Sequence, residues 1–131
     1  MSHKLLIVDD NRGCCDLYKM RFEMDKWEVK IAFSAEKALE LLEDGSYQPD
    51  AILLDIMLPK MQGDELLSIL KSDPKTKNIK VVVLTALNFF AGKEEEIANK
   101  ADDYLLKIDI MPDQLVRRVT KLVEDKELNE K

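Results

Sequence analysis

Short apolar runs recur at regular intervals along this chain and alternate with stretches of helical periodicity. The apolar runs cover residues 5–8, 29–33, 51–54, 81–84 and 104–106. Runs of this kind, rich in Val, Ile and Leu, are typical of strands that are covered on both faces of a parallel sheet. The segments between them carry apolar residues at helical spacing. The order predicts five strand–helix units and therefore an α/β fold with a parallel sheet.

Cap and turn residues support these boundaries. Ser34 can cap a helix over residues 35–42, Gly45 is a C-cap signal after it, and Pro112 suits a first helical turn. The helix within residues 88–100 has the fewest apolar anchors. No linker marks a second domain, so we expect one domain over residues 1–131, with a charged tail at residues 124–131 that frays.

Composition and charge exclude several classes of protein. The 20 Lys and Arg against 26 Asp and Glu give a net charge of −6, which argues against nucleic-acid binding. Asp9 and Asp10 end the first apolar stretch too early for a signal peptide or a membrane span. Cys14 and Cys15 are adjacent and cannot close a useful loop, although a redox pair remains an alternative. We therefore expect a cytoplasmic protein with no membrane insertion.

The chain has one histidine, His3, close to its N-terminus. This argues against Ser-His-Asp and Cys-His catalysis and against a tetrahedral zinc site. Glycine-rich phosphate loops are also absent from the sequence. Carboxylates, hydroxyls and lysines remain as the candidates for chemistry.

Polar residues follow four of the five predicted strands. Asp9 and Asp10 follow the first, Asp55 the third, Thr85 the fourth and Lys107 the fifth. The carboxyl ends of parallel strands meet at one edge, where ligands bind at the point at which strand order reverses. In a sheet of order 2-1-3-4-5, these residues converge.

Three converging carboxylates repel one another, and a shared proton or a hard divalent cation relieves the repulsion. Mg²⁺ prefers oxygen ligands, which Asp9, Asp10, Asp55 and the backbone carbonyl of Met57 could supply. Lys107 can balance Asp55 or a bound phosphoryl group. The alternative interpretation is ordinary helix capping by Asp10 together with a solvated Lys107.

Four stretches resemble the receiver domain of two-component response regulators, in particular its single-domain, chemotaxis-regulator-like members. They are LIVDD at residues 6–10, LLDIMLPKMQG at 53–63, VVLTA at 82–86 and ADDYLLK at 101–107. The resemblance covers nearly the whole chain. It implies a flavodoxin-like (βα)5 doubly wound parallel sheet of strand order 2-1-3-4-5.

The resemblance also implies a role for each matching acidic residue. Asp55 is expected to accept a phosphoryl group from a histidine kinase or a histidine phosphotransfer protein. Asp9, Asp10, Asp55 and the Met57 carbonyl are expected to hold Mg²⁺, with Mn²⁺ as an alternative. The implied protein is a phosphoacceptor with self-phosphorylation and self-dephosphorylation only, and not an enzyme with its own substrate.

The resemblance further implies a switch. Thr85 and Lys107 are expected to bind the phosphoryl group, and Tyr104 to turn inward as Thr85 moves. The surface formed by the fourth helix, fifth strand and fifth helix is then expected to bind a downstream protein.

The chain departs from the usual family pattern at several positions. Ile108 stands where the family usually has a proline, often with a cis bond, so the placement of Lys107 could differ. Gln62 stands where Asp is frequent, and Lys100 where Gly is frequent. Met57 and Leu87 are apolar at positions that tune dephosphorylation, so we expect slow loss of the phosphoryl group.

Three readings of function remain open. The chain could be a standalone regulator, a phosphorelay intermediate, or the receiver module of a larger regulator whose output domain is not among these residues. A phosphatase of the haloacid dehalogenase type would need a second acid at position 57, where Met stands. A degenerate, non-catalytic module would not be expected to retain Asp55, Thr85 and Lys107.

Overall fold

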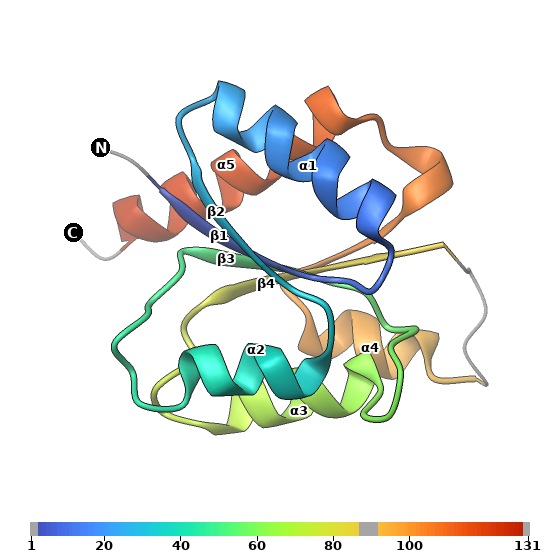
Figure 1. The fold of residues 1–131 in the computed structure, drawn as a ribbon. Coiled ribbons are helices and arrows are strands. Elements are labelled where there is room, and N and C mark those ends of the chain that lie inside the picture. The colour runs from blue at the N-terminus through green and yellow to red at the C-terminus, as the bar shows by residue number, and fades with distance from the viewer. Residues whose placement is uncertain (1–2, 87–91, 130–131) are drawn as a thin grey trace.

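Five strands form one parallel sheet in the order β2-β1-β3-β4-β5, which confirms the predicted fold (Figure 1). The structure is a computed structural model that describes residues 3–86 and 92–129. Its elements, in chain order, are β1 (Lys4–Val8), α1 (Arg12–Met24), β2 (Glu28–Ala32), α2 (Ala35–Leu42), β3 (Ala51–Leu54), α3 (Gly63–Ser72), β4 (Lys80–Thr85), α4 (Glu94–Lys100), β5 (Asp103–Leu106), the short 3-10 helix η1 (Lys107–Asp109) and α5 (Pro112–Asn129).

The sheet separates two apolar layers. Helices α1 and α5 cover one face, and α2, α3 and α4 cover the other (Figure 1). Alternate residues of a strand point to opposite faces, so Leu5 and Ile7 of β1 pack with α1 and α5, whereas Leu6 and Val8 pack with the other three helices. Both faces of β1 are therefore buried, which explains its continuous apolar run.

Local capping explains where the helices begin. Asn11 caps α1, and its side chain accepts a hydrogen bond from the backbone N–H of Cys14. The side chain of Ser34 accepts from Lys37 N–H and caps α2, as predicted. Because Asn11 takes the cap position, Asp10 does not cap α1 and its carboxylate is free for the sheet edge.

The C-terminal helix continues into the charged tail. Residues 124–129 of the tail that we expect to fray belong to α5, which ends at Asn129. Val123 is buried, and the Lys126 ammonium donates a hydrogen bond to the backbone carbonyl of Asn78, so the last turns are held against the loop before β4. Helix α4 occupies Glu94–Lys100, within the region of residues 88–100 that we predicted to be helical. Residues 88–91 of that region lie outside the described residues.

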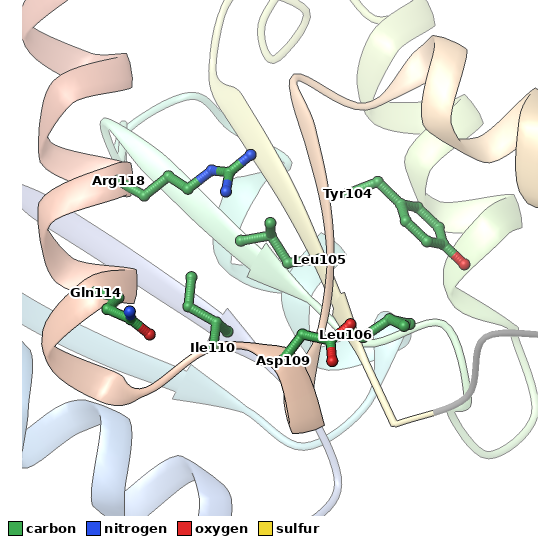
Figure 2. Close-up of a pocket in the computed structure, with 7 residues that line it drawn as sticks. All are labelled: Tyr104, Leu105, Leu106, Asp109, Ile110, Gln114 and Arg118. Atoms are coloured by element: carbon green, nitrogen blue, oxygen red, sulfur yellow. The ribbon is translucent and has the colours of Figure 1, made fainter.

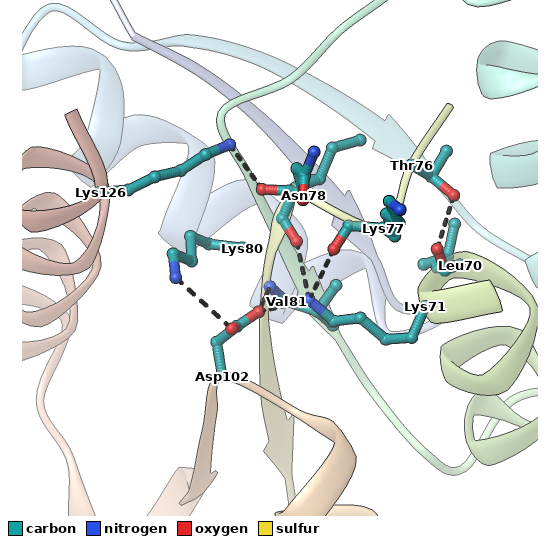
Figure 3. A network of polar contacts seen from close by, with 10 residues as sticks. Leu70, Lys71, Thr76, Lys77, Asn78, Lys80, Val81, Asp102 and Lys126 are labelled. Carbon is teal, nitrogen blue, oxygen red and sulfur yellow. Dashed lines mark hydrogen bonds and ion pairs between the residues drawn. The ribbon is translucent and has the colours of Figure 1, made fainter. Parts of the chain in front are cut away.

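A polar network closes the amino-terminal end of β4 and β5 (Figure 3). The Lys71 ammonium, at the end of α3, lies 2.7 Å from Asp102 Oδ2 and 3.0 Å from the carbonyl oxygen of Ile79. The same carboxylate oxygen accepts from Val81 N–H at 2.8 Å. These contacts hold α3 to the sheet at the edge opposite to the carboxyl ends of the strands. Among the described residues, no helix is long and apolar enough to cross a membrane.

Candidate functional site

Three carboxylates converge at the carboxyl ends of the central strands. Asp9 and Asp10 follow β1, and Asp55 follows β3. One carboxylate oxygen from each residue lies within 4.8 Å of the others. Asp9 and Asp55 are buried, whereas Asp10 is exposed. The structure thus brings together the acidic residues that the strand-end pattern predicts to meet.

Lys107 closes the site from the end of β5. Its ammonium lies 2.7 Å from Asp9 Oδ2 and 3.3 Å from Asp55 Oδ2. Sequence reasoning paired Lys107 with Asp55, but the shorter contact is to Asp9. Side-chain exposures of 13% for Lys107, 5% for Asp9 and 8% for Asp55 place these ion pairs largely out of water. One cation therefore partly neutralises two buried anions.

The two buried carboxylates also bind their own backbone. Asp9 Oδ1 accepts from the N–H of Asn11 at 2.9 Å, and Asp55 Oδ1 accepts from the N–H of Met57 at 3.1 Å. Each aspartate thus forms a side-chain turn with the residue two positions later. This arrangement fixes one oxygen of each carboxylate and directs the other toward Lys107.

Burial and charge shift the acid–base behaviour of the site. Burial raises the pKa of Asp55 above its usual range, and the neighbouring charge of Asp9 raises it further, against the opposing effect of Lys107. For Lys107, burial by itself lowers the pKa, but the hydrogen bond to Asp9 and the charges of Asp55 and Asp9 raise it overall. Lys107 therefore stays protonated, whereas ionisation of Asp55 is less favourable than ionisation of an aspartate in water.

Gly63 allows α3 to begin directly against the phosphoacceptor candidate. A Cβ at this position would lie 2.2 Å from the backbone oxygen of Asp55 and 2.6 Å from Ile56 Cα. Its N–H donates to the carbonyl of Ile56 at 2.9 Å. Sequence reasoning gave Gly63 no role, although the glycine shortly after Asp55 was the available signal.

The remaining predicted residues surround this centre. Thr85 is buried and ends β4, next to β3. Tyr104 on β5 is half-buried and packs with the apolar layer of α2, α3 and α4. Among the described residues no peptide bond is cis, so the Lys107–Ile108 bond is trans. Leu87 lies outside the described residues.

The donor set fits a hard divalent cation. Asp9, Asp10 and Asp55 offer only oxygen atoms, the ligands that Mg²⁺ and Ca²⁺ prefer over nitrogen and sulfur. The backbone of Met57 lies beside Asp55, to which its N–H is hydrogen-bonded. Neither free cysteine takes part in this acidic cluster, although the thiol of Cys15 donates to the backbone carbonyl of Asp9.

The structure is a doubly wound α/β fold whose acidic trio and lysine lie at the carboxyl ends of the strands, where proteins of this class bind their ligands. Comparison with known proteins identifies the family. The model of the response regulator receiver domain matches residues 5–120. This chain belongs to the receiver domain family of two-component response regulators, as the motifs predicted. Receiver domains are signalling modules and not classical enzymes.

Curated relatives support this membership. The chain is 36% identical over 114 residues to the DNA-binding dual master transcriptional regulator RpaA of Synechocystis sp., covering 87% of this chain and 46% of that protein. It is 34% identical over 123 residues to the transcriptional regulatory protein SrrA of Staphylococcus aureus, covering 94% of this chain and 48% of that protein. The chain therefore spans about half the length of these relatives.

Solved structures agree on the fold. The receiver domain of the Francisella response regulator 1452 superposes with a TM-score of 0.80 at 32% identity, covering 94% of this chain and 98% of that one. A CheY-like receiver domain protein from Methanospirillum hungatei JF-1 superposes with a TM-score of 0.85 at 26% identity, covering 98% and 99%.

Proposed function

We propose that this chain is a phosphoacceptor domain in which Asp55 receives a phosphoryl group from a histidine kinase or a histidine phosphotransfer protein. The observation that carries the proposal is the convergence of Asp9, Asp10 and Asp55 within 4.8 Å, with Lys107 in contact with two of them. We further propose that the whole of residues 1–131 forms this one domain and acts in the cytoplasm.

The proposed reaction is an in-line transfer. A carboxylate oxygen of Asp55 attacks the phosphorus of a phosphohistidine, and the P–N bond breaks. The electron pair of that bond goes to the imidazole nitrogen, and the imidazole leaves as a neutral ring because its other nitrogen carries the N–H proton. A carboxylate is a weak nucleophile, so the rate depends on alignment and charge neutralisation. Lys107 supplies a fixed positive charge for the transferred oxygens.

We propose Mg²⁺ as the resident cation, with Mn²⁺ as an alternative. Asp9, Asp10, Asp55 and the Met57 carbonyl would hold it. When bound, the ion neutralises charge on the phosphoryl oxygens. Because Mg²⁺ would bind the folded chain preferentially, a hundredfold excess over its dissociation constant should stabilise the fold by about 2.7 kcal/mol. A melting temperature that does not respond to Mg²⁺ would contradict the proposed metal site.

Incubation with Mg²⁺ and acetyl phosphate tests the proposed function. The intact mass should rise by one phosphoryl group, and this increase should be absent in Asp55→Ala and when the cation is chelated. Labelling that persists in Asp55→Ala would place the acceptor elsewhere and contradict the assignment. Steady release of phosphate from a simple phosphomonoester would instead favour a phosphatase.

For the output we propose the face formed by α4, β5 and α5. A cleft of about 500 Å³ opens between β5 and α5 on this face (Figure 2). Arg118 of α5 binds Asp103 at the start of β5, with 2.6 Å between Nε and Oδ2. Movement of Thr85, with Tyr104 following, would alter this face, because Tyr104 and Leu105 of β5 line the cleft. The residues that line the cleft are Tyr104, Leu105, Leu106, Asp109, Ile110, Gln114 and Arg118.

The receiver module of a larger regulator is the second proposal, and the length of the relatives favours it. RpaA and SrrA are each about twice as long as the part that matches. The DNA binding that the name of RpaA states belongs to that protein as a whole. We propose that residues 1–131 themselves contact protein partners and not nucleic acid, in line with the net charge of −6. A phosphorelay intermediate would differ by passing the phosphoryl group on to a second histidine.

A further inference from the structure

The segment that follows Asp55 is a loop pinned at its base. We define residues 56–62 as the acceptor loop, because they connect Asp55 to α3. The carbonyl of Ile56 accepts hydrogen bonds from Leu58 N–H at 3.0 Å and from Gly63 N–H at 2.9 Å. These bonds close the loop where it meets the sheet. They leave its outer part, residues 59–62, to be held by other contacts.

The outer part of the loop carries two unfavourable features. Lys60 has a φ of 60°, in the left-handed region that a side chain other than glycine disfavours. The Oε1 atom of Gln62 is buried and, within the described part of the chain, has no hydrogen-bond partner. A loop with these features needs an external contact to stay in one conformation.

Glu36 supplies that contact from another helix. Its Oε2 accepts a hydrogen bond from the backbone N–H of Met61 at 3.4 Å. Glu36 is the second residue of α2 and is only partly exposed, and Ser34 fixes the start of that helix. Among the described residues, this is the one hydrogen bond that joins residues 59–61 to another element of the fold.

We infer that Glu36 is a positioning residue for the acceptor loop: by fixing Met61 it holds the strained outer part of the loop, residues 59–62, in one conformation next to the proposed cation site. The inference rests on the proposed function, because it assigns Glu36 to the same site. Glu36 acts through Met61 and touches neither the phosphoryl group nor the cation. Loss of the contact would leave residues 59–61 held by the packing of Met61 against the apolar layer, with Lys60 still at its unfavourable φ, so the outer part of the loop would become more variable.

Removal of the Glu36 carboxylate, whose Oε2 accepts the hydrogen bond from Met61 N–H, tests this inference. Glu36→Ala should raise the dissociation constant for Mg²⁺, measured by calorimetry, by roughly three- to tenfold, the effect of one modest hydrogen bond. Glu36→Gln retains an oxygen that can accept from Met61 N–H and should stay close to the wild type. Glu40→Ala is the matched control, because this substitution removes the same charge from the same helix. The Glu40 side chain is 65% exposed.

Two further measurements separate positioning from a general loss of stability. Amide exchange at Met61 should become faster in Glu36→Ala without added metal, while exchange in the β1 core stays unchanged. Acetyl phosphate labelling of Glu36→Ala should be slow at low Mg²⁺ and should recover when Mg²⁺ is saturating. In a Lys60→Gly background, where the left-handed φ is not strained, the effect of Glu36→Ala should shrink.

The outcomes distinguish this inference from the proposed function. A wild-type chain that binds Mg²⁺ but is never labelled contradicts the proposed function and leaves the metal measurements on Glu36 valid. A labelled wild type in which Glu36→Ala and Glu40→Ala have the same affinity for Mg²⁺ overturns the role of Glu36. Equal weakening in Glu36→Gln and Glu36→Ala overturns it as well.

Discussion

The ammonium of Lys107 lies 2.7 Å from Asp9 Oδ2, a closer contact than its 3.3 Å approach to Asp55. Lys107→Met should therefore leave two buried carboxylates facing each other without a counter-charge. We expect a loss of about 1–3 kcal/mol in the free energy of unfolding at neutral pH, measured with denaturant. Added Mg²⁺ should recover part of this loss. Lys77→Met, at an exposed lysine, is the control, and equal stability of the two variants would contradict the buried pairing.

Stability should depend on pH through Asp55. A carboxyl whose pKa is raised in the folded state favours folding while it is protonated, and this contribution is lost as the pH rises through the folded pKa. The amide of Asp55→Asn does not ionise, so this variant keeps its stability as the pH rises. It should therefore melt at a higher temperature than the wild type at neutral pH. The difference should vanish below the ordinary aspartate pKa of about 3.9. A variant that is less stable than wild type at pH 7 in the absence of Mg²⁺ would refute this prediction.

Gly63 should not tolerate a side chain. In Gly63→Ala the Cβ would lie 2.2 Å from the backbone oxygen of Asp55, so α3 or the acceptor loop has to move. We expect destabilisation of about 3 kcal/mol and a loss of Mg²⁺ affinity. Gly13→Ala is the matched control. It lies in helix α1 with only ordinary contacts and should stabilise the chain by about 0.5–1 kcal/mol.

Gln62 is a poor N-cap for α3. Its backbone is extended, as a cap requires, but its side chain makes no cap hydrogen bond and its Oε1 is buried without a partner within the described residues. Gln62→Asp should place a carboxylate oxygen near the free N–H groups of the first turn and stabilise the fold by about 1 kcal/mol. Thermal unfolding measures the gain, and Gln62→Ala should show none of it.

The phosphorylated state should be long-lived. Met57 is 44% exposed beside Asp55 and offers no side-chain group that positions a water molecule. Met57→Asn should therefore accelerate the decay of the acyl phosphate, followed by intact mass, whereas Met57→Leu should not. Leu87→Glu is the corresponding change at the position two residues after Thr85 in the sequence. Unchanged decay in both Met57→Asn and Leu87→Glu would refute the idea.

The fold was readable from the sequence because burial on both faces of β1, β3 and β4 leaves a local signal, a short unbroken apolar run. The acidic site was readable because polar residues directly follow those runs. Contacts between side chains that lie far apart in the sequence could not be predicted in this way. No local pattern assigns Lys107 to Asp9 before Asp55, and none joins Glu36 to Met61, because both depend on how separate elements pack. The contact between Lys126 at the end of α5 and the distant Asn78 also leaves no local pattern in the sequence.

The described chain begins at His3 and ends at Asn129, and both ends lie at the side of the sheet away from the acidic edge (Figure 1). A fluorescent protein or affinity handle fused at either end would therefore leave the entrance above Asp55 open to a phosphate donor. A reporter joined to the C-terminal end of α5 is separated from the N-terminal end of that helix by roughly 27 Å, the length of 18 helical residues. A change at the acidic site would have to reach that reporter as a rigid-body displacement of α5.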